Sequence, residues 1–248
     1  MREKTALRRI AAAGASWISD VRFLSPVRML FWSVLTSALA TKNMTIGPAN
    51  NEAARRPVYE LIRQVRLETE MILLDNEAYN IYMGVRQTAK VVGDIAEVGV
   101  YKGGSAKLIC EAKGNRQLHL FDTFEGLPSA GSADALFKPG QFSSSLEAVR
   151  SYLSGYEAVC FYKGVFPETA APIENRRFSF VHLDVDIYES TVTSLDFFYP
   201  RMVKGGLLIS HDYMWAEGVK QAFDEFFADK PDPIIEVGGS QCAFIKVS

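Results

Sequence analysis

Apolar and polar positions alternate along residues 91–248 in a way that predicts strands and helices in turn. Short apolar runs bounded by turn residues predict strands at residues 91–100, 117–122, 158–164, 177–184, 205–213, 233–239 and 241–248. Apolar residues at helical intervals predict helices between them, at residues 104–113, 143–154, 190–202 and 217–229. Two further helices, at residues 58–75 and 76–90, are predicted ahead of the first strand.

This order of elements predicts the fold class. Strand–helix alternation that ends in a hairpin across Gly238 and Gly239 is typical of an α/β fold. We expect a Rossmann-like, doubly wound, mainly parallel seven-stranded sheet, with an antiparallel C-terminal edge strand and additional N-terminal helices. We divide the chain into an N-terminal helical extension with a linker or lid, residues 1–57, and one α/β domain, residues 58–248.

The N-terminal extension carries an apolar stretch, MLFWSVLTSALA, at residues 29–40. It is short for a membrane span and Arg28 adjoins it, so we interpret it as a helix that packs on the domain or on a second subunit. Contact with a membrane surface is the less favoured alternative. Homo-oligomerisation through the N-terminal helices also stays open. Residues 43–57 are polar and contain Gly47 and two prolines, which predicts a linker or a flexible lid.

Charge and cysteine content narrow the class of protein. A net charge of −2 gives no reason to expect a nucleic-acid partner. Cys110, Cys160 and Cys242 are widely spaced and lack CxxC spacing, so we expect buried thiols in a reducing cytoplasm. The predicted location is therefore cytoplasmic.

In a doubly wound sheet, ligands bind beyond the carboxyl ends of the strands, and the first strand here ends in a glycine-rich turn. Glu97 and Gly99 lie at that turn, and Gly103, Gly104 and Ser105 open the next helix. Glycines allow close approach of a ligand to the backbone, and a helix N-terminus offers free N–H groups. The spacing is not GxGxxG, and a plain strand-to-helix turn is the alternative.

The next two strand ends add features of a nucleoside site. Asp122 follows Gly103 by nineteen positions, a separation suited to an acid that binds ribose hydroxyls. Gly164 and Phe166 follow the third strand and are candidates to flank an adenine. A helix or loop cap by Asp122 and a core position for Phe166 are the alternatives. Together the turn and Asp122 indicate an adenosine-containing ligand.

Acidic residues follow the fourth and fifth strands. On the fourth strand, Phe178, Phe180, His182 and Asp184 are expected to share one face. Asp184 and Asp186 follow that strand, and His211 and Asp212 end the fifth. Carboxylates from two strand ends can hold one divalent cation such as Mg²⁺, which offsets their charge. The alternative is that these acids cap the following helix and turn.

The order of these motifs resembles one known family. AEVGVYKGGSA, FDTFEGLP, FSSSLEAVRSYL, HLDVDIYEST, LDFFYPRMVKGG, SHDY and the GVKQAFDEFF helix look like those of the macrocin-type O-methyltransferases. The resemblance spans residues 59–247. It implies an S-adenosylmethionine- and Mg²⁺-dependent enzyme that methylates sugar hydroxyls of antibiotics.

The resemblance also implies roles for single residues. The cofactor would lie against Glu97, Gly99, Tyr101, Gly103, Gly104, Ser105, Asp122, Thr123, Gly164, Phe166 and Asp184. Asp184 and Asp212 would bind the metal, and Asp186 would be the general base. His211 departs from the family, which usually has a second acid there. Imidazole favours softer metals, so Mn²⁺, Fe²⁺ or Zn²⁺ become alternatives to Mg²⁺, and His211 need not be a ligand at all.

The sequence thus predicts a metal-dependent O-methyltransferase that acts on a small hydroxylated molecule, such as a sugar of a natural-product glycoside. A non-catalytic Rossmann-type protein, which binds the cofactor or serves in an assembly, is the main alternative. A dinucleotide oxidoreductase is disfavoured because GxGxxG is absent and Asp184, Asp186 and Asp212 are present.

Overall fold

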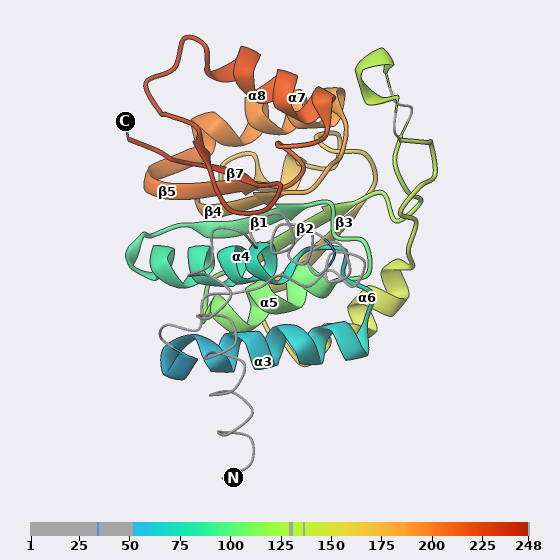
Figure 1. The fold of residues 1–248 in the computed structure, drawn as a ribbon, viewed down its shortest axis with the longest axis vertical. Coiled ribbons are helices and arrows are strands. Elements are labelled where there is room, and N and C mark those ends of the chain that lie inside the picture. Colours follow the sequence, from blue (N-terminus) through green and yellow to red (C-terminus); the bar gives the residue numbers. More distant parts are fainter. Residues whose placement is uncertain (1–33, 35–51, 129–130, 136, 248) are drawn as a thin grey trace, which may run out of the picture. The chain divides into compact units, whose positions relative to one another are not determined.

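A seven-stranded sheet runs through the middle of the α/β domain, with helices on both of its faces (Figure 1). The computed structural model describes residues 34, 52–128, 131–135 and 137–247. Residues Ala49–Ser248 form one compact unit. The strands are β1 (Asp94–Val98), β2 (Leu118–Asp122), β3 (Val159–Lys163), β4 (Phe178–Leu183), β5 (Met202–Ser210), β6 (Ile235–Glu236) and β7 (Cys242–Ile245).

The strand order is β3-β2-β1-β4-β5-β7-β6. The first five strands in this order, β3, β2, β1, β4 and β5, pair in parallel with their neighbours. Strand β7 pairs antiparallel with both β5 and β6. The predicted doubly wound, mainly parallel sheet with an antiparallel C-terminal edge is therefore confirmed. Because β1 to β5 point the same way, their carboxyl ends meet at one edge of the sheet.

Helices cover the two faces separately (Figure 1). In the described part of the chain, α3, α4 and α5 lie on one face, and α7 and α8 lie on the other. The helices are α3 (Glu52–Glu68), α4 (Asp75–Gln87), α5 (Gly104–Ala112), α6 (Leu146–Tyr152), α7 (Tyr188–Phe198) and α8 (Glu217–Phe227). Short 3₁₀ helices occupy residues Thr88–Lys90, Ser132–Asp134, Ala171–Ile173 and Tyr199–Arg201.

Strand β4 is buried along its whole length, which explains why its sequence reads as a continuous apolar run. Its side chains do not alternate regularly, however. Asp94 of β1 pairs with Phe178 and Ile95 pairs with Phe180, so Ser179 is an extra residue in β4. Phe178 consequently packs in the core on the α7–α8 face, whereas Phe180 packs in the core on the α4–α5 face. The prediction that both phenylalanines share a face was wrong.

Other predicted boundaries also move. The first helix runs from Glu52 to Glu68, so it begins inside the predicted linker and ends well before Asp75. Strand β5 begins at Met202, three residues before the expected Gly-Gly turn. Gly205 adopts a positive φ of 79° within an irregular part of this strand, where the β4–β5 register shifts. The glycines therefore accommodate a bulge and not a turn.

Several predictions concern residues that the structure does not describe. The apolar stretch at residues 29–40, apart from Val34, and the linker up to residue 51 lie outside the described residues. Among the described helices, none has the length and apolar character needed to cross a membrane. All three cysteines are free thiols; Cys110 and Cys242 are buried, and Cys160 is half-buried.

Candidate active site

A cavity of about 390 Å³ lies at the carboxyl edge of the sheet. Its walls come from the loops that follow β1, β2, β3, β4 and β5, and from residues 70–73 ahead of α4. This is the position at which doubly wound sheets bind ligands. The cavity thus brings together the strand ends that the sequence analysis singled out.

The turn after β1 is held by Asp122, the last residue of β2. The backbone N–H groups of Val100 and Tyr101 donate to Oδ2 of Asp122, at 2.7 and 2.8 Å. The backbone N–H of Phe124 donates to Oδ1 of the same carboxylate at 2.6 Å. Tyr101 has a positive φ of 50°, which these hydrogen bonds help to maintain. Asp122 therefore shapes the turn and also faces the cavity.

Most of the predicted cofactor residues line this cavity, and two do not. The lining set comprises Gly99, Tyr101, Gly104, Ser105, Asp122, Thr123, Gly164, Phe166 and Asp184. Gly103 lies outside it and is the left-handed residue, φ 81°, immediately before α5. Glu97 lies beneath the turn, fully buried, with its Oε1 atom 2.9 Å from Nδ1 of His182. Burial raises the pKa of Glu97, although hydrogen bonds from His182 and Ser105 oppose the shift.

A cluster of ionisable side chains lies at the ends of β4 and β5. Nδ1 of His211 is 3.1 Å from Oδ1 of Asp184 and 3.0 Å from Oδ1 of Asp212. One donor atom from each of these three residues lies within 4.8 Å of the others. Asp186 also lines the cavity, and both Asp186 and Asp212 adopt a positive φ of 62°. The tight turns after the strands thus direct all four side chains to one place.

These groups shift one another's protonation. Burial raises the pKa of Asp186 well above its usual range, and the charges of Asp184 and Asp212 raise it further. Burial alone would lower the pKa of His211, but Asp184, Asp212 and Glu77 raise it well above its usual value. Burial likewise opposes ionisation of Asp212, yet hydrogen bonding to His211 lowers the pKa of this carboxyl. The cluster therefore favours a positive group in its midst.

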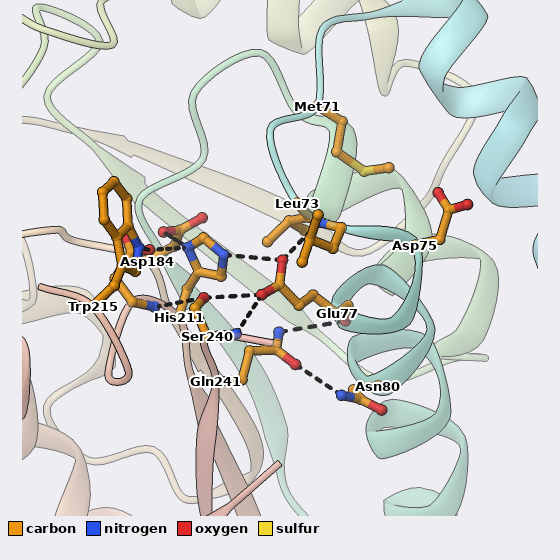
Figure 2. A network of polar contacts seen from close by, with 12 residues as sticks. Met71, Leu73, Asp75, Glu77, Asn80, Asp184, His211, Trp215, Ser240 and Gln241 are labelled. Atoms are coloured by element: carbon orange, nitrogen blue, oxygen red, sulfur yellow. Dashed lines mark hydrogen bonds and ion pairs between the residues drawn. The ribbon is translucent and has the colours of Figure 1, made fainter. Parts of the chain in front are cut away.

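Glu77 was not identified from the sequence as a functional candidate, and the contact that Trp215 makes was not expected. Glu77, near the start of α4, lies with Oε2 3.2 Å from Nε2 of His211 (Figure 2). A single glutamate early in a predicted helix gives no signal for such a contact. Trp215 lines the cavity and donates from Nε1 to Oδ1 of Asp212 at 2.5 Å. No spacing in the sequence predicts this hydrogen bond.

The fold and the site define the class of protein. The strand order, with a cavity formed by the turn after β1 and the acids after β2, β4 and β5, is that of the class I methyltransferases. The chain belongs to the macrocin O-methyltransferase (TylF) family, whose sequence model matches residues 77–246. The resemblance stated from the motifs is thereby confirmed.

Curated relatives include two enzymes from Streptomyces. The chain is 31% identical over 169 residues to 8-demethyl-8-(2,3-dimethoxy-α-L-rhamnosyl)-tetracenomycin-C 4′-O-methyltransferase of Streptomyces olivaceus, covering 60% of this chain and 64% of the relative. It is 32% identical over 168 residues to demethyldecarbamoylnovobiocin O-methyltransferase of Streptomyces niveus, covering 59% of this chain and 63% of that one. Each match thus spans somewhat less than two thirds of the relative.

Among solved structures, the O-methyltransferase NovP superposes with a TM-score of 0.66 at 27% identity. That match covers 89% of this chain and 99% of the NovP chain. The similarity therefore extends beyond the segment aligned with the curated relatives.

Proposed function

We propose that this protein is an S-adenosylmethionine-dependent O-methyltransferase that uses a divalent metal and methylates a sugar hydroxyl of a glycosylated natural product. One observation carries the proposal. A single cavity contains the glycine turn with Asp122 on one side, and the Asp184–His211–Asp212 cluster with Asp186 on the other. A methyl donor and a hydroxyl acceptor could therefore meet inside it.

The cofactor half of the cavity has the features that a nucleoside with a charged amino-acid arm requires. Gly99 and Gly104 expose backbone, and Ser105 lies in the first turn of α5, where N–H groups are free. Asp122 faces the cavity and can accept hydrogen bonds from ribose hydroxyls. Phe166 contributes an apolar surface, although it is mostly buried against Phe198.

The donor set of the cluster fits a divalent metal. Asp184 and Asp212 supply carboxylate oxygens, and His211 adds an imidazole nitrogen within 4.8 Å of them. Oxygen donors suit Mg²⁺, whereas an imidazole also suits Mn²⁺, Fe²⁺ or Zn²⁺. When bound, such a metal would lower the pKa of an acceptor hydroxyl and hold it in place.

Asp186 is the proposed general base. Its carboxyl lies in the cavity next to the cluster, within reach of a hydroxyl held there. It takes the proton of the acceptor hydroxyl, while the oxygen forms a bond to the methyl carbon and the carbon–sulfur bond of the sulfonium breaks. The products are the methyl ether and S-adenosylhomocysteine. Because the sulfonium is already reactive, the remaining contribution of the protein is alignment.

The relatives support a glycoside as the acceptor. The Streptomyces olivaceus enzyme is named for methylation of a rhamnosyl-bearing tetracenomycin, which is a glycoside. The cavity adds an apolar wall next to the cluster, where Phe137 and Trp215 pack edge to face at 6.5 Å between ring centroids. Such a wall suits the aromatic aglycone or the apolar face of a sugar.

Calorimetry and a methyl-transfer assay test this proposal. We expect S-adenosylhomocysteine to bind at micromolar concentration and NAD not to bind. With labelled S-adenosylmethionine and Mg²⁺ or Mn²⁺, a rhamnosylated aromatic aglycone should become labelled, and the free aglycone should not. If neither S-adenosylmethionine nor its demethylated product binds, the methyltransferase function is ruled out and a scaffold function gains support.

A further inference from the structure

Glu77 is a buried carboxylate that contacts the metal cluster from outside the cavity. It is 1% exposed and does not belong to the residues that line the cavity. Figure 2 shows it between the start of α4, the turn before β7 and the ring of His211. A buried charge is costly unless it is fully paired, so its partners define its role.

Within the described part of the chain, every other hydrogen-bonding partner of this carboxylate is a donor. The backbone N–H of Leu74 donates to Oε2 at 2.6 Å. The backbone N–H and the hydroxyl of Ser240 donate to Oε1, at 2.7 and 2.9 Å. These donors are fixed by the first turn of α4 and by the β6–β7 turn. Gly239 brings the second turn close, because a Cβ atom there would lie 2.4 Å from Oε1.

A carboxylate surrounded by donors acts as an acceptor toward its remaining neighbour. At 3.2 Å, Nε2 of His211 is that neighbour, and it therefore carries the hydrogen. The opposite ring nitrogen, Nδ1, then points toward Asp184 and Asp212, at 3.1 and 3.0 Å from their Oδ1 atoms. The ring is thus held in one orientation from its far side.

We propose that Glu77 is a positioning residue that fixes the ring of His211 with Nδ1 directed at Asp184 and Asp212, so that His211 serves as the third metal ligand. This inference rests on the proposed metal-dependent function. A histidine ligand needs a partner for its second nitrogen, and Glu77 supplies one.

The alternative is that Glu77 is only structural, because it also caps α4 and braces the β6–β7 turn. The two roles differ in what they require of His211. A positioning role acts through the histidine and disappears when the histidine is absent. A structural role does not depend on it.

A double-mutant cycle on Mn²⁺ affinity separates them. Dissociation constants for Mn²⁺ are measured by electron paramagnetic resonance on the full chain saturated with S-adenosylhomocysteine. We expect Glu77→Gln to weaken Mn²⁺ binding about 10–100-fold, because its amide group cannot accept from both Ser240 and His211. In a His211→Asn background, the same substitution should have no further effect. Ser240→Ala removes a hydroxyl that donates to Oε1 and accepts from the backbone N–H of Asp212 at 3.3 Å. It leaves the carboxylate that contacts His211 in place, so it should weaken Mn²⁺ binding much less.

Two results would overturn the inference. One is an equal Mn²⁺ affinity in wild type and Glu77→Gln; the other is a loss that persists unchanged in the His211→Asn background. If the wild type binds no Mn²⁺, the metal part of the proposed function fails as well, so the two failures are distinguishable. Glu77 does not line the cavity, so the affinity for S-adenosylhomocysteine reports whether each variant is folded.

The wild type alone provides a second test that does not depend on the folding of a variant. Nitrogen-15 NMR of histidine-labelled protein distinguishes the two ring nitrogens in the Zn²⁺-bound state. We expect His211 to carry its hydrogen on Nε2, with the Nδ1 signal shifted by the metal. A hydrogen on Nδ1 with Nε2 bound to the metal would contradict the role of Glu77.

Discussion

A Cβ atom on Gly99 would lie 1.8 Å from the backbone carbonyl oxygen of Asp184. The turn after β1, on the proposed cofactor side, therefore touches the backbone of the first proposed metal ligand. Gly99 also has a positive φ of 85°, which side chains other than glycine adopt at a cost. The two halves of the site therefore meet at Gly99, where the backbone of Asp184 leaves no room for a side chain.

We expect Gly99→Ala to destabilise the protein by roughly 2–5 kcal/mol, the sum of left-handed backbone strain and overpacking. Thermal unfolding measures this loss of stability, and calorimetry measures the affinity for S-adenosylhomocysteine. Gly114→Ala is the matched control, since Gly114 also has a positive φ, 61°, but nothing lies within 4 Å of its Cβ position. It should cost only about 1–2 kcal/mol. Equal losses in the two variants would show that the contact with Asp184 is unimportant.

Asp186→Asn should abolish methyl transfer and leave cofactor binding almost intact. The amide keeps the size of the side chain but cannot take a proton, and loss of a general base typically costs about 10²–10⁴-fold in rate. Single-turnover assays and calorimetry measure the two properties. Glu189→Gln, a nearby exposed acid on α7, should leave the rate unchanged. An Asp186→Asn enzyme with near wild-type turnover would remove Asp186 from the mechanism.

Asp184→Asn should weaken Mn²⁺ binding strongly, because it removes a direct ligand. Loss of a residue that only hydrogen-bonds a ligand costs about 10–100-fold in affinity, and the loss here should be larger. Activity should fall in parallel and should also be lost when EDTA is added to the wild type. Asp229→Asn is a suitable control, since the side chain of Asp229 is 84% exposed. Full activity in EDTA would refute the metal-dependent mechanism.

The stability of metal-free protein should depend on pH through His211. Its pKa is raised, because Asp184, Asp212 and Glu77 outweigh the effect of burial. The stabilisation is therefore complete below the unfolded pKa of about 6.5 and is lost as pH rises through the higher folded pKa. In urea unfolding with EDTA, the stability advantage of wild type over His211→Asn should shrink as pH rises above neutrality.

His119 should change the stability of the protein with pH in the opposite direction to His211. Burial lowers the pKa of His119, although its contact with Asp94 opposes the shift. The folded state favours the neutral form of His119. The contribution of His119 to the free energy of unfolding is therefore present above its unfolded pKa and is lost as pH falls below about 6.5. The stability of wild type relative to His119→Asn should therefore decrease on acidification. A pH-independent difference for both histidines would contradict this account.

Local pattern was sufficient for much of the fold. The helix predicted at residues 76–90 is found as α4 and the following 3₁₀ turn, Asp75–Gln87 and Thr88–Lys90. The strands that precede the site end within three residues of their predicted ends, because apolar runs and the glycines after them are short-range signals. The errors lie where tertiary contacts decide: Ser179 bulges between two neighbouring strands, and Gly205 lies inside β5 and not in a turn.

The sequence by itself determined that Asp184, Asp186, His211 and Asp212 follow two strands, and the rule that parallel strands end at one edge predicted that they would meet. It could not determine which nitrogen of His211 faces the acids. That is decided by Glu77, which is 134 residues away along the chain and reaches His211 only when α4 packs beside the β6–β7 turn. Hydrogen-bond direction at a buried site depends on partners that no local spacing specifies, so only the tertiary structure could reveal it.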